Sequence, residues 1–266
     1  MNTLHIETTG SGPDLVLLHG WAMHGGVFAP LAERLAADHT LHLVDLPGHG
    51  HSADAGLPLA MGPVVDELVE RLPRALWLGW SLGGLFALQA ALARTSAVRG
   101  VALLCSSPRF VREPAGEGAW RYGMSPEIFE DFAAGLREDW RGTLERFIAL
   151  EAFGSDHAKE ELRTLRDGLF ARGEPAAGVL ATGLRLLQEV DLRAALPGLP
   201  VPSLWLAGRR DRVVDPRAMR EAAAMAPRAR FEQVEHAGHA PFLTHAGEVA
   251  DALRRFESSL APCKDR

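Results

Sequence analysis

Short apolar runs alternate with longer helix-like segments along most of this 266-residue chain. The clearest runs span residues 15–18, 41–44, 76–78, 98–104 and 203–206. Each run is too short for a buried helix, and most of them end at a Gly, Pro or Asp. Because their hydrophobicity is continuous rather than alternating, we expect strands covered on both faces. The pattern therefore predicts an α/β fold with a mostly parallel central sheet flanked by helices.

Two segments depart from this pattern. Residues 3–8 alternate between apolar and polar side chains, which predicts an antiparallel edge strand. Between residues 109 and 189 strand-like runs disappear and amphipathic stretches follow one another. We expect helices over residues 126–136, 140–153, 158–170 and 175–188. The chain is thus predicted to have a core of residues 1–108 and 190–266, with an all-helical lid, residues 109–189, inserted between two core strands.

The composition excludes several classes of protein. A formal net charge of −6 argues against a general nucleic-acid binder, which usually carries a basic excess. Cys105 and Cys263 are too few for a disulfide scaffold and show no metal-type spacing, so we expect a reducing compartment and no metal. The first residues do not resemble a signal peptide, and no apolar stretch approaches the roughly 18 residues of a membrane span. We therefore expect a cytoplasmic protein.

A Gly-x-Ser-x-Gly pattern at residues 79–83 directly follows one predicted strand and precedes a helix-like segment, residues 85–92. The pattern alone occurs by chance in glycine-rich turns. A strand before it and a helix after it, however, are the context of a nucleophile elbow, in which the serine sits on a sharp turn. The glycines make room for the backbone to pass, and the helix N-terminus stabilises negative charge. Ser81 is therefore the candidate nucleophile.

A serine hydroxyl needs a histidine to take its proton, and that histidine needs an acid to orient it. Asp211 directly follows the predicted strand at residues 203–206, where parallel strands place catalytic side chains. Asp215 is the alternative, but it precedes Pro216 and is better explained as the start of a helix. Asp211 is therefore the preferred acid.

The histidine is expected in the loop after the strand-like segment 231–234. His239 lies deep in that loop, before the Ala-Pro that begins the last helical segment. His236 is closer to the strand end, where it could be a surface residue. Either histidine completes the chain order Ser, Asp, His of an elbow-type hydrolase. We prefer His239, with His236 second, because His239 lies deeper in the loop.

An oxyanion hole requires two backbone N–H donors. One is expected from Leu82, the residue after the nucleophile, and the other from the loop after the first parallel strand, where we assign Trp21. His19 is expected to support that loop rather than to transfer protons. The glycine-rich residues 45–52 lack the lysine and the spacing of a phosphate-binding loop, so we expect a tight scaffold turn there.

These motifs together resemble the α/β-hydrolase superfamily along nearly the whole chain. They comprise residues 19–21, 44–50, 79–84, 208–211 and 238–239. More narrowly, the chain is similar to the pimeloyl-[acyl-carrier protein] methyl ester esterases of biotin synthesis. That similarity involves residues 41–48, 76–84 with their two tryptophans, 145–150, 190–193 and 239–242.

The resemblance implies a cofactor-free carboxylesterase that frees methanol from the methyl ester of pimeloyl-acyl carrier protein. It implies the catalytic roles given above for Ser81, Asp211 and His239, and an acyl channel lined by Phe147. The full set of substrate-binding residues that it implies is Trp21, Ser81, Leu82, Phe147, Ile148, Ala149, Leu150, Glu151 and His239. The lid matches only loosely outside residues 145–150, and the tail at residues 261–266 departs from the family as an extension.

Acyl carrier proteins are acidic, so a docking surface on the lid would need cations. The candidates are Arg146, Lys159 and Arg163, and the last two recur at helical spacing together with Arg166. Acidic residues such as Glu160 and Glu161 are interleaved, as on an ordinary solvated helix.

Two other functions remain as alternatives to the carrier-ester esterase. They are a generalist esterase or lactonase of the same fold and a non-catalytic binding protein. We expect a monomer that binds neither nucleic acid nor membranes.

Overall fold

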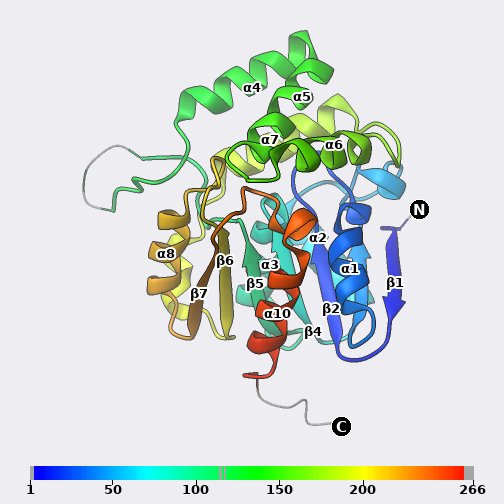
Figure 1. Cartoon of the computed structure of the whole chain (residues 1–266), viewed down its shortest axis with the longest axis vertical. Coiled ribbons are helices and arrows are strands. Elements are labelled where there is room, and N and C mark those ends of the chain that lie inside the picture. Colours follow the sequence, from blue (N-terminus) through cyan, green and yellow to red (C-terminus); the bar gives the residue numbers. More distant parts are fainter. Residues whose placement is uncertain (1–2, 114–115, 117, 261–266) are drawn as a thin grey trace.

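The computed structural model describes residues 3–113, 116 and 118–260, and within them the strands form one twisted sheet (Figure 1). The strand order is β1-β3-β2-β4-β5-β6-β7; β1 pairs antiparallel with β3, and all other pairs are parallel. The strands are β1 (Ile6–Gly10), β2 (Asp14–Leu18), β3 (Thr40–Val44), β4 (Ala75–Trp80), β5 (Val98–Leu104), β6 (Ser203–Gly208) and β7 (Ala229–Val234). The predicted parallel sheet with an antiparallel edge strand is confirmed.

Helices cover both faces of the sheet. In Figure 1, α1 (Ala29–Leu35) and α10 (Ala246–Glu257) lie in front of it and pack against each other. On the other face α2 (Met61–Arg71) packs on α3 (Leu82–Ala93), which contacts β4 and β5. The remaining core elements are α8 (Pro216–Met225), α9 (Pro241–Thr244) and the 3-10 helices η1 (Gly25–Phe28), η2 (Gly50–Ser52) and η3 (Arg193–Gly198). Burial on both faces explains why the central strands are apolar throughout.

Four consecutive helices lie between β5 and β6 and cover the carboxyl ends of the strands (Figure 1). They are α4 (Pro126–Glu138), α5 (Trp140–Ala152), α6 (Ala158–Leu169) and α7 (Ala177–Glu189). The helices predicted from the amphipathic stretches are thus present, with ends that differ by one or two residues. We refer to residues 109–189 as the lid segment. In the described ranges, no helix combines the length and apolar character needed to cross a membrane.

Hydrogen bonds tie the lid segment to the core beneath it. The Trp21 indole N–H donates to the carbonyl of Leu180 on α7 at 2.9 Å. Glu161, a fully buried carboxylate of α6, accepts from the hydroxyl of Thr244 on α9 at 2.6 Å and from the hydroxyl of Ser155 at 2.7 Å. The structure therefore holds these helices directly over the loops that follow β2, β4 and β7.

Candidate active site

Ser81 occupies a strained turn between β4 and α3. Its backbone angles, φ 52° and ψ −119°, lie in a region that side-chain-bearing residues rarely adopt. A Cβ on Gly79 would lie 2.3 Å from the carbonyl oxygen of Gly83, and one on Gly83 would lie 2.2 Å from that of Leu18. Only glycine fits at either position. The strand-to-helix elbow expected around Ser81 is therefore present, and its two glycines have the expected steric role.

Asp211 and His239 form a buried hydrogen-bonded pair at the carboxyl end of the sheet. His239 Nδ1 donates to Asp211 Oδ2 at 2.8 Å, and both side chains are inaccessible to solvent. The other oxygen of Asp211 accepts from the backbone N–H groups of Val213 and Val214 at 2.8 and 2.9 Å. Asp211 is thereby fixed by its own loop, and the His239 ring is held with Nε2 as the nitrogen free for chemistry.

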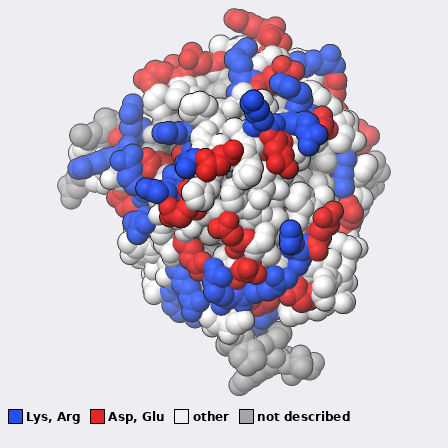
Figure 2. Space-filling model, in the orientation of Figure 1, with Lys and Arg blue, Asp and Glu red and all other residues white. Residues whose placement is uncertain are grey.

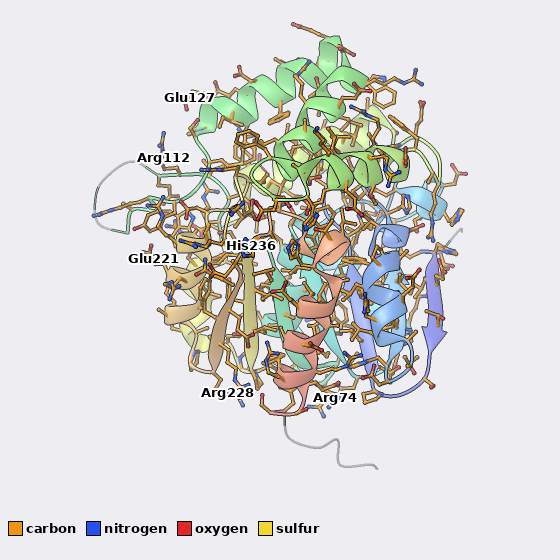
Figure 3. The ribbon with its side chains drawn as sticks, in the orientation of Figure 1. Arg74, Arg112, Glu127, Glu221, Arg228 and His236 are labelled. Carbon is orange, nitrogen blue, oxygen red and sulfur yellow. The ribbon has the colours of Figure 1, made fainter. Side chains whose placement is uncertain are left out.

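The two alternative residues lie elsewhere. Asp215 caps α8, where its side chain accepts from the backbone N–H of Arg217 at 2.8 Å. His236 is 64% exposed and pairs with Asp156 at 3.0 Å. Figure 3 shows His236 near the lid, above β6 and β7. Neither residue belongs to the buried pair.

Three further residues connect the parts of the site, and sequence patterns did not identify their roles. Trp80 donates its indole N–H to the carbonyl of His239 at 2.8 Å. Ser106 donates its hydroxyl to the carbonyl of Ser81 at 2.7 Å. The Sγ of Cys105 lies under the histidine loop, accepts from the N–H of Gly208 at 3.3 Å and has a strongly raised pKa because it is buried. Of these three roles, only that of Trp80 had a sequence signal, the distinctive tryptophan beside the candidate nucleophile.

Cys105, Asp211 and His239 offer atoms that lie within 4.8 Å of one another, as metal ligands can. This chemistry does not suit a metal, because the raised pKa of the Cys105 thiol keeps it protonated and Asp211 is already bonded to His239. The closeness of these three side chains is better explained by the packing of Cys105 beneath the loop that carries His239.

The loop after β2 passes directly beside Ser81. A Cβ on Gly20 would lie 3.2 Å from the Cβ of Ser81. His19 supports this loop as expected: its Nδ1 donates to the carbonyl of Gly20 at 2.8 Å, and its Nε2 accepts from the N–H of Leu46 at 2.9 Å. Burial and the neighbouring His49 lower the pKa of His19 to about 3, so its ring is neutral.

Only one face of α5 turns toward the site. Phe147, Ile148 and Glu151 are buried, whereas Ala149 is exposed on the opposite side and Leu150 is half-buried. Since helical residues three or four apart share a face, a continuous run of five cannot all line one channel. The structure therefore does not bring Ala149 to the site, which corrects the expectation for that residue.

An aromatic cluster joins the loop after β2 to two helices of the lid segment. The ring of Phe147 packs edge-on against Trp21 with centroids 4.8 Å apart, and Phe132 of α4 contacts both rings. Ser81 is only 1% exposed and His239 is fully buried. We refer to Trp21, Phe132 and Phe147 as the aromatic enclosure, and sequence patterns did not indicate Phe132 as a member of it.

Besides His19 and Cys105, two more ionisable groups of the site have shifted pKa values. Burial opposes the charged form of His239, but the charge and hydrogen bond of Asp211 and the charge of Glu151 outweigh it, so the His239 pKa is raised. Burial raises the pKa of Glu151 to about 8, against the opposing effect of His239. Histidine thus gains basicity, while Glu151 is a neutral acid near pH 7.

The candidate docking cations lie on the outer surface of the lid segment. Arg146 on α5 and Lys159 and Arg163 on α6 are all exposed. Glu161, which the sequence suggested as an interleaved surface charge, is instead buried against Ser155 and Thr244. Figure 2 shows both signs of charge over the lid helices. The cations are accessible, and one of the acidic residues thought to offset them is not on the surface.

Relatives of this chain are found by both sequence and structure. The family profile described as "Alpha/beta hydrolase family" matches residues 15–252. The pimeloyl-[acyl-carrier protein] methyl ester esterase of Stenotrophomonas maltophilia strain K279a is 57% identical, covering 97% of this chain and 98% of its own. The esterase of the same name from Xanthomonas oryzae pv. oryzae strain MAFF 311018 is 55% identical, covering 97% and 100%.

Solved structures share the fold at lower identity. An esterase from Exiguobacterium antarcticum superimposes with a TM-score of 0.81 at 23% identity, covering 97% of this chain and 100% of that one. The enol-lactonase from Burkholderia xenovorans LB400 gives a TM-score of 0.81 at 22% identity, covering 96% of each chain. With the elbow, the buried Asp-His pair and the full-length matches in agreement, the chain belongs to the alpha/beta hydrolase family.

Proposed function

We propose that this chain is a serine carboxylesterase that hydrolyses the methyl ester of pimeloyl-[acyl-carrier protein] to methanol and pimeloyl-[acyl-carrier protein] in biotin synthesis. One observation carries the proposal. A hydrogen-bonded Asp211–His239 pair and a serine on a strained elbow occur together in a chain 57% identical over almost its whole length to an esterase of that name.

In the proposed mechanism Ser81 Oγ attacks the ester carbonyl carbon while His239 Nε2 takes the serine proton. Asp211 orients the imidazole and stabilises its charged form through the 2.8 Å hydrogen bond. The tetrahedral intermediate collapses, methanol leaves with the proton from Nε2, and Ser81 carries the acyl group. Water then attacks the acyl carbon, gives its proton to Nε2 and releases the acid.

We assign the oxyanion hole to the backbone N–H groups of Trp21 and Leu82. Leu82 is the first residue of α3, so its N–H has no partner within the helix and lies at the positive end of the dipole. The close approach of Gly20 to Ser81 brings the Trp21 loop within reach of the same oxygen. Donors placed in this way act on the charge that develops in the transition state.

Phe147, together with Trp21, Ile148 and Phe132, is proposed to line the acyl channel. A seven-carbon chain is apolar along its middle, which suits this enclosure. Because Ser81 is 1% exposed here, a carrier-bound acyl chain requires the lid segment to open.

The direct test is mass-spectrometric detection of methanol and pimeloyl-[acyl-carrier protein] from the purified protein. Ser81→Ala is the control and should release neither. Labelling of wild type by a fluorophosphonate probe should occur and should be lost in Ser81→Ala; an unlabelled wild type would indicate a non-catalytic binding protein.

Growth separates the specific ester from a general esterase activity. Expression of this chain should rescue a biotin-requiring strain that lacks its own esterase. Failure to rescue, combined with good expression and turnover of short p-nitrophenyl esters, would reject the carrier-bound substrate and favour a generalist esterase or lactonase.

We further propose that Arg146, Lys159 and Arg163 dock the acidic carrier protein. Phe153 lies in the connection between the two helices that carry these cations, and its 61% exposed side chain would offer the carrier an apolar contact. Charged partners of this kind raise association rates and orient the complex more than they add affinity. The docked carrier would lie on the lid segment, above the aromatic enclosure.

The docking proposal predicts a split between substrates. Lys159→Glu and Arg163→Glu should raise KM for the carrier-bound ester and leave turnover of small esters near wild type. Arg74→Glu is a matched control, because Arg74 is exposed at the opposite end of the molecule (Figure 3). Equal losses on both substrates, or an equal effect of Arg74→Glu, would reject docking on the lid segment.

We also propose that the enzyme acts as a monomer in the cytoplasm. The Asp-His pair, the elbow serine and the aromatic enclosure all come from one chain, so a single copy holds the complete site. Light scattering coupled to size exclusion should give a mass near that of one chain, and cell fractionation should recover the esterase activity with the cytoplasm. A dimeric mass, or activity in the periplasm, would overturn the corresponding part.

A further inference from the structure

Glu151 places an unused carboxyl group inside the candidate active site. Its Oε1 lies 3.9 Å from His239 Nε2, and both side chains are fully buried. Within the described residues, neither Glu151 oxygen has a hydrogen-bond partner, and neither does His239 Nε2. The backbone of the same residue is engaged, because the N–H of His239 donates to the carbonyl of Glu151 at 3.2 Å. Such a buried, unsatisfied acid requires an explanation.

In the proposed mechanism, a water oxygen must lie next to His239 Nε2 during the second step. Nε2 first faces the methanol that leaves and then faces the water that replaces it. Two hydrogen bonds of about 2.8 Å each can span 3.9 Å when a single oxygen bridges them at roughly a right angle. A water held between Nε2 and Glu151 would therefore occupy the position from which the second step starts.

Burial and the charge of Asp211 favour the neutral form of Glu151, whereas the charge of His239 opposes it. The other titratable groups around the site are the buried Cys105, under the histidine loop, and the buried Glu161 on α6. With the Glu151 pKa raised to about 8 by burial, the group is a carboxylic acid near pH 7 and has both a donor and an acceptor. An ionised Glu151 would instead pair with protonated His239 and remove the proton acceptor.

We propose that the Glu151 carboxyl positions the water that His239 deprotonates during hydrolysis of the acyl-enzyme. The inference rests on the proposed function, since it requires an acyl group on Ser81. The water oxygen bonds to the acyl carbon, and its proton passes to Nε2. The bond from that carbon to Ser81 Oγ then breaks, and Nε2 returns the proton to Oγ. Glu151 neither gains nor loses a proton, so it acts by orienting the water.

The test compares Glu151→Gln and Glu151→Leu in a burst experiment with p-nitrophenyl acetate. Glu151→Leu removes the hydrogen bonds, so the steady-state rate should fall at least tenfold. The burst of nitrophenol, which reports acylation of Ser81, should keep an amplitude of one equivalent per site and a rate near that of wild type. Glu151→Gln keeps a donor and an acceptor and should stay within about threefold of wild type. Glu145→Gln, an exposed change on the same helix, is the matched control.

The pH profile gives a readout that a structural role would not produce. In wild type, kcat should fall as pH rises through about 8, because ionised Glu151 cannot donate and holds His239 protonated. Glu151→Gln cannot ionise and should lose this alkaline fall. This variant keeps the proposal testable even if Glu151→Leu fails to fold.

Several outcomes would overturn the proposal. Persistence of the alkaline fall in Glu151→Gln would do so, as would equal slowing of the burst and steady-state phases in Glu151→Leu. No nitrophenol release from wild type or Glu145→Gln would overturn the proposed function itself, and this role with it. Activity in both of these proteins, with unchanged kinetics in Glu151→Leu, would reject only the role of Glu151.

Discussion

The indole N–H of Trp80 donates to the backbone carbonyl of His239 at 2.8 Å, across 159 positions of sequence. Trp80 ends β4 and precedes Ser81 directly, so this bond joins the strand of the candidate nucleophile to the loop of its histidine. The same ring packs against Phe242, with centroids 4.9 Å apart. A buried contact thus links the backbone next to Ser81 to the backbone of His239.

Replacing Trp80 by Phe should lower kcat roughly tenfold with little effect on KM. The change leaves the carbonyl of His239 buried without its donor, at a cost of about 1–3 kcal/mol, and lets the loop shift. Steady-state kinetics and urea unfolding would measure the two effects.

Trp77 supplies the matched control for this prediction. It is a buried tryptophan on the same strand, and its indole N–H has no hydrogen-bond partner in the described part of the chain. Trp77→Phe removes the same atoms without breaking a hydrogen bond, so it should change stability more than kcat. A drop in kcat as large as that of Trp80→Phe would contradict the positioning role.

Replacing Asp211 by Asn should reduce kcat by about 10⁴-fold, since the histidine loses the charge that fixes its tautomer. Asp215→Asn should leave kcat within about twofold, because the Asp215 side chain caps α8 and Asn also caps a helix N-terminus. Rates for one small ester at pH 7.5 would compare the variants. Similar losses in both would mean that the acid of the triad is wrongly assigned.

Replacing Gly83 by Ala should destabilise the protein by about 3 kcal/mol. Its new Cβ would lie 2.2 Å from the backbone oxygen of Leu18, so β2 or α3 must move. Gly62→Ala is the control: Gly62 lies in α2 with open space around it, and alanine there should stabilise by up to about 1 kcal/mol. Urea unfolding would measure the free energy of unfolding of both variants. A Gly83→Ala protein as stable as Gly62→Ala would contradict the prediction.

A buried ion pair outside the site should make stability depend on pH. His39 Nε2 bonds Glu257 Oε2 at 2.8 Å, and its Nδ1 bonds Asp38 at 3.1 Å, while Arg99 also contacts Glu257. The Glu257 hydrogen bond raises the pKa of His39, and His39 in turn lowers the pKa of Glu257.

The directions of these two pKa shifts define the pH range in which the pair stabilises the protein. A raised His39 pKa contributes stability that is present below the unfolded pKa of about 6.5 and is lost as pH rises through the folded value. A lowered Glu257 pKa contributes stability above about 4.3 that is lost as pH falls. The difference in unfolding free energy between wild type and His39→Gln should therefore be largest near pH 5–6 and shrink by pH 9. A constant difference would argue against this pair.

Much of the fold followed from local patterns. The continuous apolar runs predicted the parallel strands, and the alternating run predicted the antiparallel edge strand β1. The elbow at Ser81 was recognisable because its serine and its two glycines lie within five consecutive residues, between a strand-like and a helix-like segment, although one of the close contacts of Gly83 is with the distant Leu18. The chain order of Asp211 and His239 followed from the rule that catalytic loops come after parallel strands.

Other features depended on which distant segments meet. The run of residues 147–151 predicted five lining residues, but the pitch of α5 turns Ala149 to solvent and Glu151 toward His239. Glu161 has the sequence context of a surface charge, yet α6 buries it against Thr244.

For this protein, the sequence alone determined the elements, their order and the candidate nucleophile with its two partners, because hydrophobic period and turn sterics act over a few residues. Only the tertiary structure decided that Trp80 bonds the His239 loop and that the buried Glu151 carboxyl lies 3.9 Å from Nε2. Those contacts join residues far apart in the chain, and the burial that shifts the pKa of Glu151 exists only once the lid segment packs on the core.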